Sequence, residues 1–121
     1  MKRILLADDQ KAVRRALRLL LEQEEKCTIA GEVQDGGGLL AAVESGAADV
    51  VLLDWELPGL EVGRLLPLSN GKGARIRVIA MSSRPEAQAA ALAAGVDACI
   101  SKGKPAEEVL ETIYKVVGDE A

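Results

Sequence analysis

The stretch Asp49–Asp54, which reads Asp-Val-Val-Leu-Leu-Asp, decides the fold of this chain. Its four consecutive apolar residues predict a short strand that is buried on both faces. Such a strand is typical of a parallel sheet with helices packed on each side, because a crossover helix must connect every pair of parallel strands. We therefore expect helices and further strands to alternate on either side of this stretch.

The rest of the chain supplies that alternation. Short apolar runs predict four more strands, at Ile4–Ala7, Thr28–Val33, Arg77–Met81 and Ala98–Ser101. Helical spacing of apolar residues or helix-end signals predict helices over 9–24, 36–44, 60–68, 83–95 and 105–118. Five strands that alternate with five helices predict right-handed crossovers and a doubly wound α/β sheet. We expect one domain over residues 1–121, since this length suits a single core.

Several helix ends carry recognisable signals. Asp35 is expected to cap the helix over 36–44. Ser83-Arg84-Pro85-Glu86 has the spacing of a capping box, with Ser83 as the N-cap and Glu86 three residues later. Pro105 is expected at the first position of the last helix. The basic residues Lys11, Arg14, Arg15 and Arg18 are interpreted as a solvated helix face, with docking of a kinase as the alternative.

Composition excludes several classes of protein. Hydrophobic residues make up 49% of the chain, which argues against disorder, and no apolar run approaches the roughly 20 residues of a membrane span. With no histidine, neither histidine catalysis nor histidine metal ligation is available. A net charge of -4 argues against nucleic-acid binding by this domain alone. Cys27 and Cys99 have no metal-site spacing, and the N-terminus lacks a secretory signal, so we expect a cytoplasmic protein.

Chemically useful residues follow four of the predicted strands. Asp8 and Asp9 follow the first, Asp54 ends the third, Ser82 follows the fourth and Lys102 follows the fifth. In an open α/β sheet the carboxyl ends of the strands form the ligand site, so these side chains are expected to converge. Three carboxylates repel one another unless a cation joins them, and oxygen ligands suit Mg²⁺. The set predicts phosphoryl transfer in which a carboxylate acts as the nucleophile.

The motifs that carry these residues resemble the receiver domain of bacterial two-component response regulators, and the resemblance covers essentially the whole chain. They are Leu5–Asp9, Leu52–Pro58, Ala80–Ser82 and Ala94–Lys102. The resemblance implies the flavodoxin-like strand order 2-1-3-4-5 and a phosphoacceptor signalling domain that switches conformation. The resemblance also implies that the domain catalyses only its own phosphorylation and dephosphorylation. Its phosphoryl group would come from a sensor histidine kinase or a phosphotransfer protein.

The same resemblance implies a role for each site residue. Asp54 accepts the phosphoryl group, and Lys102 holds that group by charge. Asp9 ligates Mg²⁺ directly, and Asp8 acts largely through a water molecule. The backbone carbonyl of Glu56 supplies a further ligand, and Ser82 senses the phosphoryl group.

Three features of the sequence depart from the family pattern. Cys99 stands where the family often has tyrosine or phenylalanine, Gly103 stands where proline commonly follows the lysine, and the stretch from Ser82 to Gly95 is about two residues short. These departures keep open the alternative of a docking module that phosphorylation does not regulate. A haloacid-dehalogenase-type phosphatase is disfavoured because Asp8-Asp9-Gln10 does not fit its DxDxT pattern, and an FMN module because the chain has only two aromatic residues.

Two further expectations concern the rim of the site and assembly. Glu56 and Arg84 are long, oppositely charged and placed two residues after Asp54 and Ser82, so an ion pair between them is expected to slow loss of the phosphoryl group. The helix over Pro85–Ala94 carries more alanines than one buried stripe uses. We expect this helix and the last helix to form a homodimer contact.

Overall fold

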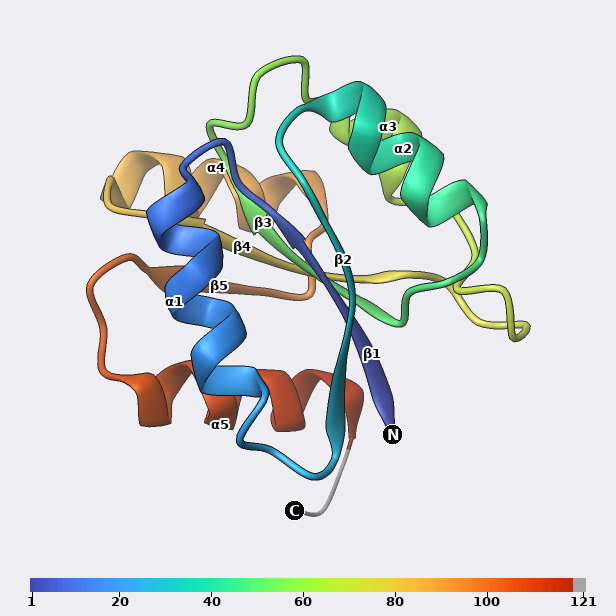
Figure 1. The fold of residues 1–121 in the computed structure, drawn as a ribbon. Helices are drawn as coiled ribbons and strands as arrows, with labels where there is room; N and C mark the ends of the chain where they lie inside the picture. The colour runs from blue at the N-terminus through green and yellow to red at the C-terminus, as the bar shows by residue number, and fades with distance from the viewer. Residues whose placement is uncertain (119–121) are drawn as a thin grey trace.

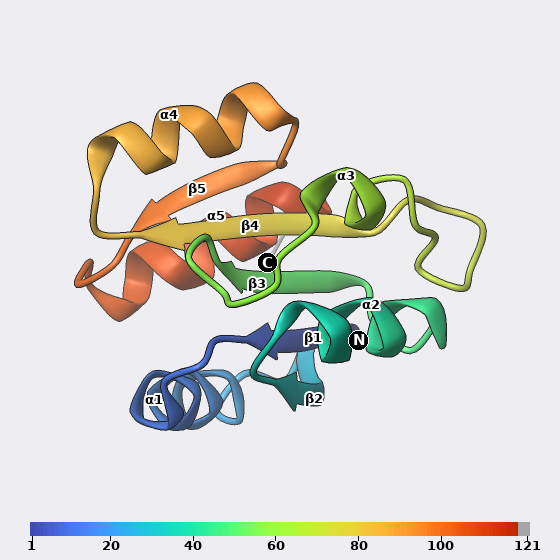
Figure 2. The same cartoon turned by 90° about the horizontal axis from the view of Figure 1, so that it is seen from above.

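β3 (Val50–Asp54) lies at the centre of a five-stranded parallel sheet, and all of its residues are buried. The structure is a computed structural model that describes residues 1–118, so residues 119–121 of the expected domain lie outside the described part. The strand order is β2-β1-β3-β4-β5, as expected, with β2 and β5 at the two edges (Figure 2). The other strands are β1 (Lys2–Ala7), β2 (Cys27–Val33), β4 (Arg77–Ser82) and β5 (Ala98–Ser101).

Helices cover both faces of this sheet (Figure 1). They are α1 (Lys11–Leu21), α2 (Gly36–Glu44), α3 (Val62–Leu65), α4 (Pro85–Ala94) and α5 (Ala106–Val117). Alternate residues of β3 point to opposite faces: Val50 and Leu52 pack with α1 and α5, whereas Val51 and Leu53 pack with α2, α3 and α4. The predicted doubly wound fold is therefore confirmed. Within residues 1–118, no helix combines the length and the apolar character needed to cross a membrane.

The first predicted helix, 9–24, begins later and ends earlier than expected. Asp8 accepts a hydrogen bond on Oδ1 from the amide of Gln10, and this turn keeps Gln10 extended as the N-cap. α1 therefore starts at Lys11 and leaves Asp9 in the turn beyond β1. The third predicted helix, 60–68, is reduced to the single turn Val62–Leu65. Gly63 and Pro67 account for this, because glycine weakens a helix and proline restricts the residue before it.

The predicted capping box at the start of α4 is wrong. Arg84, not Ser83, is the N-cap, with extended backbone angles (φ -106°, ψ 123°), and no side chain caps this helix. The reason is Pro85, since a residue before proline is disfavoured in the helical conformation. Pro105 is likewise one position earlier than expected, as the N-cap of α5. Asp35 does cap α2, because its Oδ1 accepts from the amide of Gly38 at 2.7 Å.

The amino end of the sheet is fastened by an ion pair between Arg3 and Asp49. The guanidinium of Arg3 donates two hydrogen bonds to the carboxylate, at 2.9 and 3.1 Å, and the Arg3 amide donates a third at 2.8 Å. The same side chain donates to the carbonyls of Gly46 and Asn70. The hydrogen bonds from Arg3 outweigh burial and lower the pKa of Asp49 to about 2. The pair therefore ties β1 to the loops on either side of β3.

We expect Asp49→Asn to lower the free energy of unfolding at neutral pH by on the order of 2 kcal/mol. The folded pKa of Asp49 lies below its unfolded value of about 3.9, so this stabilisation is complete above that value and is lost as the pH falls towards 2. Urea unfolding of both proteins across this range checks the expectation. A difference between them that stays constant down to the acid end would contradict it.

A close approach of backbones joins α2 to the loop that follows β3. The amide of Gly36 donates to the carbonyl of Pro58 at 2.7 Å, and a Cβ atom on Gly36 would lie 1.8 Å from the carbonyl oxygen of Gly59. Only glycine fits at position 36 without moving this loop. Within the glycine run at 36–38, Gly36 is therefore required for packing. Gly37 is exposed, and a Cβ there would meet no atom closer than 3.6 Å.

The two neighbouring glycines should respond oppositely to alanine. Gly36→Ala forces the backbone of Gly59 to shift, so it should lower the free energy of unfolding by about 2 kcal/mol or more. Gly37→Ala meets no clash and reduces the freedom of the unfolded chain, so it should raise stability by roughly 0.5–1 kcal/mol. Thermal unfolding of the two variants decides the matter, and equal effects would show that the contact at Gly36 does not constrain the loop.

Candidate functional site

Three strand ends carry the same local structure. The side chains of Asp8, Asp54 and Ser82 each accept a hydrogen bond from the backbone amide two residues further on, at 2.8, 3.0 and 3.1 Å. These turns orient one oxygen of each side chain and end the strands β1, β3 and β4. Because the three strands are parallel neighbours, the three side chains lie at the same edge of the sheet.

A cluster of three carboxylates lies at this edge. One oxygen each from Asp8, Asp9 and Asp54 lies within 4.8 Å of the other two. Asp8 and Asp54 are buried, whereas Asp9 is exposed. Hard carboxylate oxygens at this spacing, with one side open to water, fit a divalent cation that keeps part of its hydration. The structure thus brings together the three acidic residues that the sequence indicated.

Lys102 joins this cluster from the end of β5. Its Nζ lies 3.2 Å from Oδ2 of Asp8 and 3.4 Å from Oδ1 of Asp54. Burial lowers the pKa of Lys102, but the hydrogen bond to Asp8 and the charges of Asp8 and Asp54 together raise it above its ordinary value. The ammonium therefore stays charged at neutral pH. Gly103 follows with φ of 92°, a conformation closed to proline, which explains the departure at that position.

Ser82 is fully buried at the end of β4, whereas Ser83 is exposed. The carbonyl of Ser82 accepts from the amide of Lys102 at 3.0 Å and from the side-chain amide of Gln88 at 3.1 Å. Gln88 comes from α4, and no sequence pattern indicated this contact. These bonds link the backbone of the hydroxyl-bearing residue both to the lysine and to a helix on the surface.

Glu56 and Arg84 form an ion pair at the rim, as expected, with 2.8 Å between their side chains. The amide of Glu56 donates to Asp54, and the amide of Arg84 donates to Ser82. The pair therefore spans the two loops that follow β3 and β4. Both side chains are about half exposed, so the pair adds little to stability, roughly 0–1 kcal/mol. The backbone carbonyl of Glu56 stays a predicted ligand.

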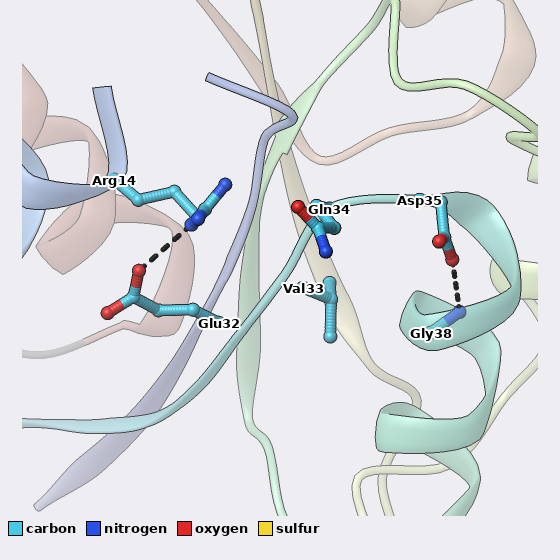
Figure 3. A pocket seen from close by; sticks show the side chains of 6 residues that line it. All are labelled: Arg14, Glu32, Val33, Gln34, Asp35 and Gly38. Atoms are coloured by element: carbon cyan, nitrogen blue, oxygen red, sulfur yellow. Dashed lines mark hydrogen bonds and ion pairs between the residues drawn. The ribbon is translucent and has the colours of Figure 1, made fainter. Parts of the chain in front are cut away.

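Arg14 has a place in the structure that the sequence did not indicate. The interpretation of a wholly solvated basic face is wrong for this residue, because its side chain is only 14% exposed. Its Nη1 donates to the backbone carbonyl of Asp8 at 2.7 Å. Its Nε donates to Glu32 at 2.9 Å, as Figure 3 shows. Arg18, one helical turn later, also binds Glu32. The sequence signal for this contact was Glu32 on the neighbouring predicted strand, but the number of residues between Glu32 and α1 does not specify which basic residue it binds.

Cys99 lies half-buried on β5, packed against the core on the α4 side of the sheet. Burial raises the pKa of its thiol. Cys99 is therefore placed as a small residue packed at the edge of the core.

Comparisons with known proteins agree on the family. The family model of the response regulator receiver domain matches residues 4–114. The response regulator UvrY of Escherichia coli is 31% identical over 118 residues, which cover 93% of this chain and 53% of UvrY. A protein-glutamate methylesterase/protein-glutamine glutaminase of Myxococcus xanthus is 30% identical over 97% of this chain and 34% of the relative. The chain thus spans between a third and about half of the length of these curated relatives.

Solved structures share the fold over nearly the whole chain. A LuxR-family DNA-binding response regulator from Staphylococcus aureus is 30% identical with a TM-score of 0.81, and the match covers 96% of this chain and 98% of that one. The receiver domain of the sensor histidine kinase PA1611 from Pseudomonas aeruginosa has a TM-score of 0.82 at 21% identity, with 98% of both chains covered. At 21% identity, the similarity to the PA1611 receiver domain shows a shared fold only.

Proposed function

The chain belongs to the response regulator receiver family, and from this premise we propose that it is a single phosphoacceptor domain of a two-component system. Asp54 is the phosphoacceptor, and the donor is a sensor histidine kinase or a phosphotransfer protein. The observation that carries the proposal is the position of Lys102, whose ammonium lies 3.2 Å from buried Asp8 and 3.4 Å from buried Asp54, two members of the cluster of three carboxylates. This arrangement supplies a nucleophile, a cation and ligands for a metal in one place.

Asp8, Asp9 and Asp54 fit Mg²⁺, with the backbone carbonyl of Glu56 as a further ligand. Support comes from the spacing of the carboxylates and from the receiver domain of PA1611, which holds a magnesium ion coordinated in its active-site cleft. When bound, the ion supplies positive charge that offsets the negative charge of the carboxylates and of the phosphoryl oxygens. Lys102 adds a second positive charge beside Asp8 and Asp54, and the hydroxyl of Ser82 would donate to a phosphoryl oxygen.

The reaction is a displacement at phosphorus. An Oδ atom of Asp54 forms the new P–O bond while the P–N bond of the donor phosphohistidine breaks. The donor imidazole leaves with the electron pair of that bond and takes up a proton. The product is an acyl phosphate, whose added charge draws Ser82 and Lys102 inward. Because Ser82 is bonded to Gln88 and Lys102, this movement reaches α4 and β5.

The output of the whole protein follows as part of the same proposal. The chain corresponds to only part of each curated relative, so we assign it control of an output domain or of a separate partner in the cytoplasm. Regulation of transcription is the favoured output because the relatives include DNA-binding response regulators. A docking module that phosphorylation does not regulate is the competing function, and the departure at Cys99 is what favours it.

Trp55 adjoins Asp54 and should report on the site. We expect Mg²⁺ to change its fluorescence in the millimolar range, as suits a few carboxylates with retained water. Beryllofluoride should change the signal further only with Mg²⁺ present, and Asp54→Asn should abolish labelling by acetyl phosphate. An Asp54→Asn chain that still acquires phosphate would refute the assignment of the phosphoacceptor. A wild-type chain that is never labelled would favour the docking module.

The ion pair between Glu56 and Arg84 should set the lifetime of the acyl phosphate. It closes the rim between two loops, and a fall of about 1.4 kcal/mol in the barrier to attack by water is a tenfold change in rate. We expect Glu56→Ala and Arg84→Ala each to shorten the lifetime several-fold, measured by loss of radiolabel, with the double variant no worse than either single one. Additive effects would show that the two residues act separately.

A homodimer contact is proposed for α4 together with α5. Only Ala87 and Ala91 of α4 are buried, and Leu92 is 54% exposed. The remaining exposed alanines, Ala89, Ala90, Ala93 and Ala94, allow a partner helix to approach closely. We expect beryllofluoride with Mg²⁺ to shift the chain from monomer towards dimer in light scattering, and Leu92→Glu to prevent the shift. A monomer in both states at high concentration would remove this contact from the proposal.

A further inference from the structure

We propose that Arg14 is a positioning residue of the metal site, which holds the peptide group between Asp8 and Asp9 so that both carboxylates face the same ion. This inference rests on the proposed function, because it concerns the ligands of the Mg²⁺ assigned there. It gives a role to a residue that belongs to neither the cluster of carboxylates nor the rim.

The carbonyl that Arg14 binds belongs to the peptide linking the two aspartates. Nη1 of Arg14 donates to the Asp8 carbonyl at 2.7 Å, and the amide of Asp8 donates to the carbonyl of Val33 at 3.1 Å. A peptide group is planar, so the direction of its carbonyl fixes the plane in which the next residue starts. The backbone of Asp8 is thus bonded on both sides, and the backbone entry into Asp9 is set by Arg14.

Asp9 depends on this backbone more than the other two ligands do. Asp8 is held by Gln10 and Lys102, and Asp54 by Glu56 and Lys102. The carboxylate of Asp9 is exposed, and no hydrogen bond or ion pair within the described residues restrains it. Its distance from the other two carboxylates is therefore governed by the turn after β1, whose carbonyl Arg14 binds.

Arg14 is itself held in the position that this role requires. Glu32 of β2 accepts from its Nε at 2.9 Å, and the guanidinium lies beside a pocket of about 300 Å³ lined by Arg14, Glu32, Val33, Gln34, Asp35 and Gly38 (Figure 3). A guanidinium is planar and carries several donors, so one group binds both the carboxylate and the carbonyl, which a lysine ammonium does less well. With 14% exposure, the bond to Asp8 is largely shielded from water.

Arg18 provides a matched comparison. Its Nε lies 2.7 Å from the other oxygen of Glu32, so Arg18 also ties α1 to β2, but its bonds go to Glu32 and Glu22 and not to Asp8. If Arg14 did no more than join α1 to β2, the two arginines would be equivalent. If Arg14 acted only through its charge, its removal would strengthen the binding of a cation nearby. Positioning makes the opposite prediction.

The test measures Mg²⁺ affinity of the full chain by Trp55 fluorescence and Mn²⁺ affinity by electron paramagnetic resonance. We expect Arg14→Gln to weaken both by about tenfold, a change of about 1.4 kcal/mol. Arg14→Lys should lie between Arg14→Gln and wild type, and Arg18→Gln should stay within about twofold of wild type. Thermal unfolding, recorded in parallel, should show similar losses for Arg14→Gln and Arg18→Gln, so that stability does not explain the difference in affinity.

Unchanged or tighter binding in Arg14→Gln would overturn the inference, as would an equal loss in Arg18→Gln. If Arg14→Gln does not fold, Arg14→Lys is compared with Arg18→Lys, and only the former should bind the ions more weakly than wild type. A wild-type chain that binds neither ion would instead refute the proposed metal site. The failure of the inference is thereby distinguished from the failure of the proposed function.

Discussion

The charge balance at the carboxyl edge of the sheet is the constraint on which the rest of the structure depends. Two aspartates are buried there within reach of one another, and a buried carboxylate is costly unless a cation or hydrogen bonds compensate it. Lys102 meets both of them, although it comes from the far end of the chain. The sheet must therefore bring β5 into register with β4, β4 with β3, and β3 with β1. An error in any of these pairings would leave a buried charge without its partner.

The two ends of the sheet differ in how their charges are compensated. At the amino end, Arg3 and Asp49 are matched one to one, and further hydrogen bonds complete the set. At the carboxyl end, carboxylates outnumber the ammonium group beside them. The ion pair at the amino end leaves no excess charge, whereas the carboxyl end keeps an excess of negative charge. This follows from the parallel topology, which gathers every strand end of one kind at one edge.

Sequence patterns predicted the strands and the convergence of the three aspartates for a specific reason. β3 is apolar throughout and ends in Asp54, so both its burial and the position of its carboxylate follow from the order of residues alone. The strand order could not be derived in this way and came from the family resemblance. The start of α4 was misjudged because a proline outweighed a favourable capping pattern. The contact of Arg14 with Asp8 could not be predicted from the sequence, since it depends on how α1 packs against β2.

α4 packs on the sheet through small side chains only, which lowers the cost of moving this helix. Its buried side chains are the methyl groups of Ala87 and Ala91, whereas α5 buries Val109 and Ile113 and α1 buries Leu17 and Leu21. The cost of displacing a helix grows with the volume of the hole that it leaves behind. Withdrawing two methyl groups opens a far smaller hole than withdrawing branched side chains. Of these three helices, α4 is therefore the one that can slide over the sheet while the interior beneath it stays filled.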